Sequence, residues 1–377
     1  MSGRGRLVAG ALALLVVLAV DRFEPPAEAQ QAGAAPTFKG DPAWPTIPGT
    51  IAVGEVSSVA VDSRDHIWVL HRPRSIPAEK RAQAAPPVLE FDSTGKLLAS
   101  WGGDAPGYDW PEREHGIFVD AKDFVWISGN GGWPRPTTPG TGDDMILKFT
   151  MAGKLVMQIG HRGQSKGNMD TDNVHQPADT FVDARASELY VADGYGDQRI
   201  VVFDTNTGKF KRMWGAFGNA PTPEMKPNPP VPQPQEPGTE GPQQFGLPHA
   251  VKVSTDGTVY VADRINNRIQ LFTTAGKYLR TVRVTNPDAA VVPVPAGFSF
   301  SPDKPQQYLY VVDSGPMRVV IFDRKTMSQV GVVGMRGAGP GEFNIVHHMA
   351  ADSKGNLYTA EIVTNRRAQR FVPQRGH

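Results

Sequence analysis

The sequence contains no cysteine among its 377 residues. Disulfides, cysteine nucleophiles and cysteine-ligated metals are therefore excluded. The sequence also has no large excess of charge of one sign. Its 39 Lys and Arg residues nearly balance its 38 Asp and Glu residues, which gives a net charge of +1. A nucleic-acid partner calls for a basic patch or stripe, so this balance argues against one. The chain must hold together through an apolar core, for which 40% hydrophobic residues are sufficient.

Long hydrophobic runs are also scarce, and the clearest one lies near the N-terminus. Leu7 to Val20 is a 14-residue apolar run that follows two arginines. It is too short to span a bilayer comfortably, and "AEA" at Ala27–Ala29 is a small-residue cleavage site. We predict that residues 1–29 are a cleaved secretory signal peptide and that 30–43 are a flexible segment. The mature protein is then secreted or periplasmic and has no membrane span.

A strand-turn-strand pattern recurs six times along the chain. The aromatic residue in the second strand of each copy marks the period: Trp68, Trp126, Tyr190, Tyr260, Tyr310 and Tyr358. A spacing of about 50 residues with four short strands per unit is typical of a β-propeller. We predict one all-β domain over 44–375, a six-bladed propeller. Little chain follows Phe371, so a strand from about Trp44 to Val53 is expected to complete the sixth blade and close the ring.

The spacing is widest before Tyr260, where residues 220–242 contain nine prolines and no apolar periodicity. This composition predicts an extended or mobile loop between the third and fourth blades, and not a domain. The loop could shield one mouth of the propeller channel or be a solvated connection without function.

Three histidines occupy equivalent positions in alternate blades. Five residues before the end of each first strand, the chain carries in order Ser57, His115, Ala178, His249, Ala296 and His347. First strands line the channel of a propeller, so alternate blades, about 120° apart, would bring three imidazoles to one axial point. Three histidines with an open fourth position are typical of catalytic zinc. A single strand-end histidine is more often structural, and that is our interpretation of the four without such partners: His66, His71, His161 and His175.

Two arginines and a tyrosine are expected at the same mouth. Arg72 and Arg264 follow the second strands of the first and fourth blades, and Tyr195 follows "ADG" in the third. A guanidinium fork suits a substrate carboxylate. Cationic neighbours favour a phenolate, which could act as a general base. Each of these residues could also be an ordinary loop residue.

The repeat over roughly residues 50–375 resembles the NHL repeat, in particular at "YVADRINNRIQLF". Five further motifs are similar to those of the peptidyl-α-hydroxyglycine α-amidating lyases (peptidylamidoglycolate lyases): "LHR" with Arg72, "EHGIFVD" with His115, "DGYGDQRI" with Tyr195, "PHAVKVSTDGTVYVADRINNRIQ" with His249 and Arg264, and "FNIVHH" with His347. The resemblance implies a six-bladed propeller with zinc on the three histidines. It also implies a catalytic tyrosine and two substrate arginines. The activity it implies is cleavage of a hydroxyglycine C–N bond to an amide and glyoxylate.

Some features depart from this family. Ile345 replaces a methionine near the metal, and His348 replaces a carboxylate that helps to hold a structural calcium, which argues against calcium here. The sequence leaves two other functions open. One is a non-catalytic NHL propeller that binds a peptide, glycan or envelope protein, and the other is a metal-dependent propeller hydrolase such as a lactonase. The expected partner is a small molecule or peptide that carries a carboxylate, and the expected state is a monomer.

Overall fold

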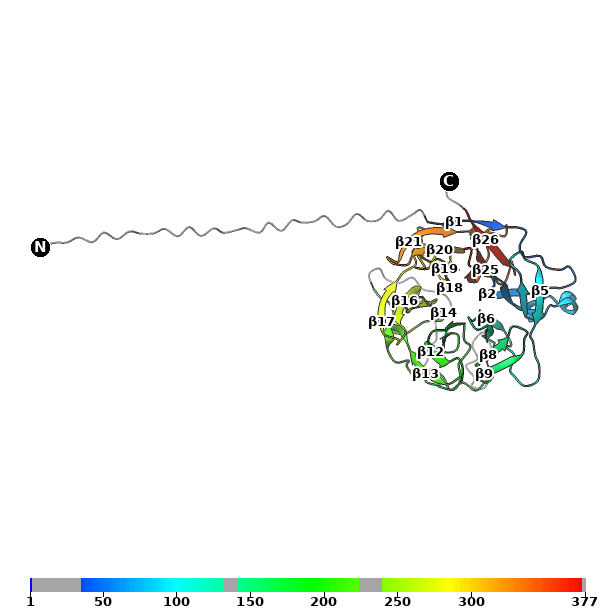
Figure 1. Cartoon of the computed structure of the whole chain (residues 1–377), viewed down its shortest axis with the longest axis horizontal. Helices are drawn as coiled ribbons and strands as arrows, with labels where there is room; N and C mark the ends of the chain where they lie inside the picture. The colour runs from blue at the N-terminus through cyan, green and yellow to red at the C-terminus, as the bar shows by residue number, and fades with distance from the viewer. Residues whose placement is uncertain (2–34, 132–141, 224–238, 375–377) are drawn as a thin grey trace. The chain divides into compact units, whose positions relative to one another are not determined.

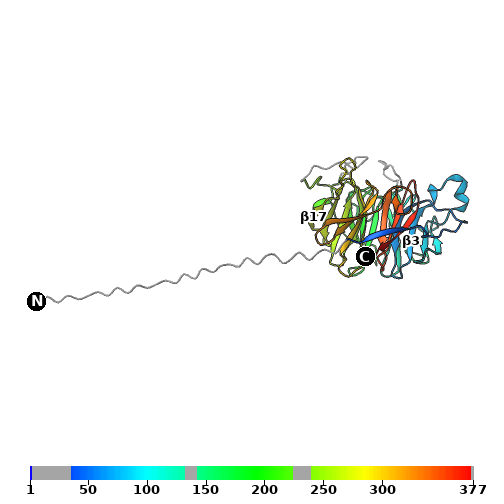
Figure 2. The same ribbon diagram turned by 90° about the horizontal axis from the view of Figure 1, so that it is seen from above.

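The computed structural model describes Met1 and residues 35–131, 142–223 and 239–374. Within 36–374, six four-stranded antiparallel sheets are arranged in a ring around a central axis (Figure 1). Figure 2 turns this view by 90° and shows the strands side-on. The prediction of an all-β, six-bladed propeller is confirmed.

Each blade runs in order from the axis outward. The first blade is β2 (Glu55–Val61), β3 (Ile67–Arg72), β4 (Val88–Phe91) and β5 (Leu97–Trp101), and the second is β6 (Glu114–Val119), β7 (Phe124–Gly129), β8 (Met145–Thr150) and β9 (Leu155–Gly160). The third is β10 (Asp179–Asp183), β11 (Glu188–Asp193), β12 (Arg199–Asp204) and β13 (Phe210–Trp214), and the fourth is β14 (Pro248–Val253), β15 (Thr258–Asp263), β16 (Arg268–Thr273) and β17 (Tyr278–Val282). The fifth is β18 (Pro295–Phe300), β19 (Tyr308–Asp313), β20 (Arg318–Asp323) and β21 (Ser328–Val333), and the sixth is β24 (Val346–Ala351), β25 (Leu357–Glu361), β26 (Ala368–Gln374) and β1 (Thr37–Asp41).

Burial follows the position of a strand within its blade. The second strands β3 and β11 are buried at every residue, because both faces of each sheet pack against neighbouring blades. The outermost strand β5 instead alternates between half-buried and exposed residues. Continuous apolar runs such as "LYVA" therefore belong to the inner strands, and alternating runs to the rim.

The aromatic residues that reveal the repeat also connect the strands of a blade. Trp126 donates its indole N–H to Asp120 at 2.8 Å, and Tyr358 donates its hydroxyl to Asp352 at 3.0 Å. Each acceptor is the aspartate that directly follows the inner strand of the same blade. In these blades the aromatic residue therefore holds the inner turn, and in all six its buried ring belongs to the apolar core.

The N-terminal strand closes the ring, as predicted, but the predicted residues are wrong. β1 (Thr37–Asp41) pairs with β26 in an antiparallel register that joins Thr37 to Gln374 and Asp41 to Arg370. This strand lies within the segment that was expected to be flexible. No strand of the described chain covers Trp44 to Val53, where Pro45 and Pro48 cannot donate to a ladder. Trp44 is instead a core residue against Tyr358, with ring centroids 4.9 Å apart.

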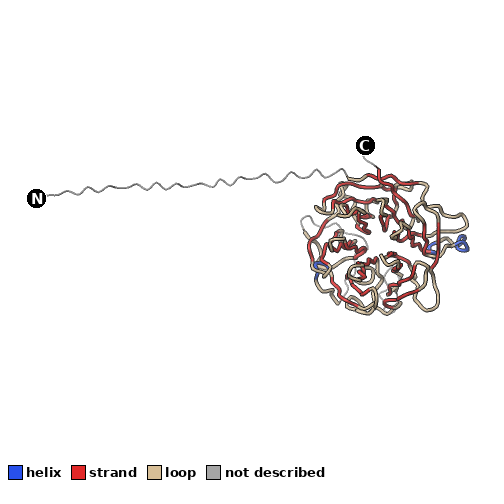
Figure 3. The backbone as a smooth tube through the Cα atoms, in the orientation of Figure 1, coloured by secondary structure: helices blue, strands red, loops and turns tan. Residues whose placement is uncertain are grey.

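The remaining elements are small. A parallel pair, β22 (Met335–Arg336) and β23 (Glu342–Phe343), and three 3-10 turns, η1 (Pro73–Ser75), η2 (Ala78–Gln83) and η3 (Ala216–Gly218), lie outside the blades (Figure 3). No helix among the described residues has the length and apolar character needed to cross a membrane. The predicted signal peptide and most of the proline-rich loop lie outside the described residues.

A charged cluster joins the third and fourth blades, and we expect it to make stability depend on pH. Hydrogen bonds from Arg212, together with Lys211, lower the pKa of Glu188 to about 2, and Arg212 also donates to the carbonyl of Thr274. The unfolded carboxyl titrates near pH ~4.3, so this contribution is present above that pH and is lost as the pH falls toward about 2.

Glu188→Gln should therefore lower the unfolding free energy by about 1–2 kcal/mol at pH 7, after allowance for solvent screening. The difference from the wild type should shrink as the pH falls below ~4. Thermal unfolding of both proteins between pH 6 and 2 measures this, and a difference that stays constant over that range would contradict it.

Candidate metal centre

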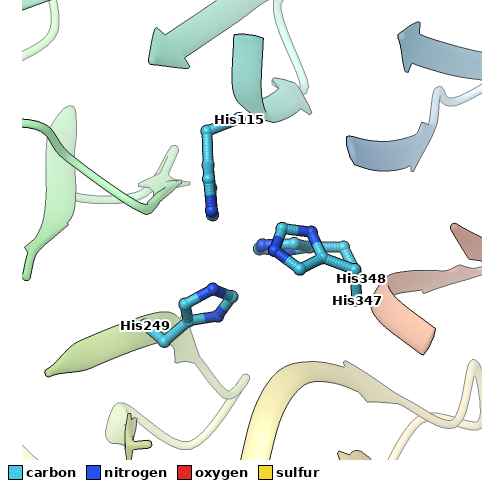
Figure 4. Close-up of side chains that lie close together, drawn as sticks. All are labelled: His115, His249, His347 and His348. Carbon is cyan, nitrogen blue, oxygen red and sulfur yellow. The ribbon is translucent and has the colours of Figure 1, made fainter. Parts of the chain in front are cut away.

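A β-bulge places each residue of the histidine column. The pairing of inner and second strands shifts register at Pro248/Ala250 in the fourth blade, at Glu114/Gly116 in the second and at Val346/His348 in the sixth. The extra residue is the column histidine in each case. A bulge re-aims the side chain of its extra residue, so the imidazoles turn toward the axis at the start of the inner strands. Figure 4 shows them pointing toward a common centre.

Each column histidine is anchored by the next blade. Nδ1 lies 2.7 Å from the carbonyl oxygen of Ala178 for His115 and 2.6 Å from that of Ala296 for His249. Nδ1 of His347 lies 2.6 Å from the carbonyl oxygen of Ser57. A carbonyl oxygen only accepts, so Nδ1 carries the proton and the Nε2 lone pair is free for another partner. The small residues that alternate with the histidines thus supply the carbonyls that orient them.

The imidazoles are neutral. Burial, then the neighbouring imidazoles, lowers the pKa of His115 and His347 well below the ordinary value, and burial, then Arg264, does so for His249. Neutral imidazole is the form that binds a metal. The ligand atoms of these histidines and of His348 lie within 4.8 Å of one another, so this buried cluster could hold a metal ion.

The Tyr195 hydroxyl lies between two of the imidazoles, 3.0 Å from Nε2 of His115 and 3.1 Å from Nε2 of His249. One phenolic proton cannot satisfy two lone pairs at once. The centre therefore has more acceptors than donors, and a cation is the kind of ligand that would balance it. Tyr195 is 5% exposed and comes from the loop after β11, as its place in the repeat predicts.

The two arginines differ in how they are engaged. Arg264 Nη1 lies 3.3 Å from the Tyr195 hydroxyl, and its buried Nε has no hydrogen-bond partner within the described part of the chain. Arg72 is 3% exposed, donates Nε to the carbonyl of Glu114 at 2.8 Å and pairs with Glu55 at 2.7 Å. The structure brings Arg264 directly to the tyrosine. Two donors of Arg72 are already used, one by Glu114 of the second blade and one by Glu55 of its own blade.

A buried ion pair holds the backbone segment that precedes His249 in the fourth blade. Asp263 ends β15, pairs with Arg268 at 2.9 Å and accepts the backbone N–H groups of Gly246 and Leu247. These are the residues that lead into His249. The recurring acid and arginine of the repeat thus hold the chain where it enters the inner strand.

His348 is the site residue that the sequence did not reveal. Its side chain is buried, and its ring centroid lies 4.7 Å from that of His347 and 5.2 Å from that of His249. Strict alternation would turn two adjacent strand residues to opposite faces, but the bulge at Val346/His348 brings both to the centre. The only sequence signal is the adjacent pair of histidines at the column position.

The histidines predicted to be structural lie outside the centre. His71 accepts the N–H of Gly54 at Nδ1, and His66 bonds Glu90 at 2.7 Å. His161 is mostly exposed beside Asp109, and His175 lies 3.6 Å from Asp197. None of the four is part of the axial cluster.

Comparison with known proteins matches residues 245–272 to the NHL repeat model. The chain carries an NHL repeat. This stretch covers β14, β15 and β16, so the repeat includes His249 and the Asp263–Arg268 pair.

The NHL propeller is similar to three proteins in particular. It is 26% identical over 346 residues to NHL repeat-containing protein 3 of Mus musculus, covering 90% of this chain and 85% of that protein. It is 24% identical over 345 residues to peptidyl-glycine alpha-amidating monooxygenase B of Xenopus laevis, covering 86% of this chain but only 34% of that protein. It is 24% identical over 235 residues to a probable peptidyl-alpha-hydroxyglycine alpha-amidating lyase of Caenorhabditis elegans, covering 58% of this chain and 56% of that protein. The relatives of this propeller therefore include amidating enzymes as well as a repeat protein whose name states no activity.

Proposed function

We propose that this NHL propeller is a zinc-dependent lyase. It would cleave the C–N bond of a peptidyl-α-hydroxyglycine-like carbinolamide to give an amide and glyoxylate. The observation that carries the proposal is the position of the Tyr195 hydroxyl, within 3.1 Å of Nε2 of both His115 and His249 and 3.3 Å from Nη1 of Arg264. A proton acceptor, a metal centre and a carboxylate-binding cation then converge on one point.

The residues present fit a zinc ion. His115, His249 and His347 would hold it through Nε2, with their tautomers set by the backbone carbonyls. The surplus of acceptors around Tyr195 is the structural reason to expect a cation. Zinc, when bound, would polarise the substrate hydroxyl oxygen and stabilise negative charge on it.

The chain's own residues account for the proton and for orientation. Arg264 would bind the substrate carboxylate through its guanidinium and hold the hydroxyl near Tyr195. Tyr195 as phenolate would take the hydroxyl proton, the hydroxyl-bearing carbon would become a carbonyl, and the C–N electron pair would pass to nitrogen. Nitrogen gains a proton, so the products are an amide and glyoxylate without addition of water. Tyr195 can supply this proton to the nitrogen by returning the one that it took, which restores the phenolate for another turnover.

The direct test is to load the purified protein with zinc and incubate it with a short peptide that ends in α-hydroxyglycine. We expect glyoxylate and peptide amide to form in equal amounts, faster than without protein. A zinc-loaded protein that releases neither product would contradict the lyase and favour a propeller that only binds its partner. Release of a ring-opened acid from a lactone by the same preparation would instead favour the hydrolase.

A further inference from the structure

The buried imidazole of His348 has no role in the three-histidine scheme. It is 4% exposed, and its Nε2 has no hydrogen-bond partner among the residues that the structure describes. The three column histidines, by contrast, each bond a backbone carbonyl through Nδ1. A buried polar atom without a partner is unfavourable and rare, so this nitrogen needs an explanation such as a ligand.

The equivalent positions of the other blades leave room for this ring. The residue after the column position is small in four blades: Ser58, Gly116, Ala250 and Gly297. In the third blade it is Asp179, whose Oδ2 is taken by Lys252 at 2.8 Å and by the N–H of Val251 at 3.2 Å. This carboxylate oxygen is therefore already hydrogen-bonded. Only the sixth blade fills this level of the channel with an imidazole.

His348 and Tyr195 enter the centre at different levels of the channel. Tyr195 comes from the loop after β11 at the mouth where the inner strands begin, and its ring contacts those of His115 and His249, whereas His348 is one residue further along β24 than His347. It also lines the cavity formed with Asp179, Lys252 and Phe181, which continues to the far ends of the inner strands at Asp352. A donor at this level would not compete with Tyr195 for space.

We infer that His348 is a fourth imidazole donor to the ion held by His115, His249 and His347. The protein then presents four nitrogens, and a substrate oxygen would enter as a fifth ligand on the side of Tyr195. Zinc tolerates this expansion, and a set made only of imidazoles also suits copper, nickel and iron. The inference depends on the metal centre of the proposed function but not on its reaction.

The test compares the wild type with His348→Ala in competition with a chromophoric zinc chelator. We expect zinc affinity to fall by about 100-fold or more, beyond the 10–100-fold typical of residues that only orient a ligand. The Co²⁺-loaded proteins should also differ in their visible absorption, because the number of nitrogen donors changes.

Two controls make the result specific. Met349→Leu changes the next buried residue of β24 and should leave zinc affinity and the Co²⁺ spectrum unchanged. His348→Asn replaces Ala if the smaller side chain prevents folding, and it should show the same loss of affinity. Unchanged affinity and spectrum in the His348 variants would overturn the inference. A wild type that binds metal but releases no glyoxylate would contradict only the lyase, and one that binds no metal would contradict both.

Discussion

Tyr195→Phe should slow glyoxylate release by about 10²–10⁴-fold, the usual range for loss of a general acid or base. The phenylalanine ring can occupy the same buried space, but it has no oxygen to accept the substrate proton. The hydroxyl now bridges His115 and His249 at 3.0 and 3.1 Å, so its removal takes away one atom at the centre and none of the ligands. Steady-state rates on an α-hydroxyglycine peptide, with zinc content measured on the same samples, check this.

The control for this variant is Tyr310→Phe, which removes the hydroxyl of a buried tyrosine of β19, outside the axial cluster. It should keep the wild-type rate. Tyr195→Phe should retain about one zinc per chain, because metal binding rests on the histidines. Undiminished turnover in Tyr195→Phe would remove the tyrosine from the mechanism, whereas loss of zinc from the variant would mean that it acts through the metal site.

His249→Ala should abolish tight zinc binding. The wild type is expected to carry about one zinc per chain after dialysis against a weak chelator, and the variant to lose it. Removal of a direct ligand should lower affinity by at least about 100-fold, more than removal of an outer-shell partner does. The substitution also breaks the contact of Nδ1 with the carbonyl oxygen of Ala296. Elemental analysis of both proteins, followed by the glyoxylate assay, measures the effect.

His66→Ala is the matched control, because His66 is a histidine of the first blade that bonds Glu90 outside the axial cluster. It should keep the zinc. Retention of stoichiometric zinc by His249→Ala would show that the ion is not held on the axis. The column histidines would then be strand-end residues, and the interpretation as a binding propeller would become the better one.

The fold and most of the centre could be predicted because they depend on residues that keep a fixed position within the repeat. Aromatic residues such as Trp126 recur because every blade needs a large buried ring in its core. The histidines His115, His249 and His347 could be found because they share one position in alternate blades. Residues at the same position of each repeat lie at the same distance from the propeller axis. The three histidines could therefore be placed together without knowing how the loops fold.

The parts that could not be predicted depend on local register. We predicted that Trp44 to Val53 closes the ring, but Trp44 packs against Tyr358 in the core. The segment Thr37–Asp41, which is shorter and less apolar than the predicted one, closes the ring instead. His348 should face away from His347 by alternation, and only the bulge brings it to the centre. A bulge leaves no mark in one sequence, because it arises from how two strands pair.

Because of the carbonyl contacts of the column histidines, the centre can be completed only after the last blade has been synthesised. The proton of His347 is accepted by Ser57, a residue 290 positions earlier in the chain. The other two contacts join the second blade to the third and the fourth to the fifth. A chain still emerging from the ribosome can assemble two of these contacts but not the one that spans the seam. A metal bound as proposed would therefore mark a polypeptide that has been finished and closed, and a prematurely terminated product would lack that mark.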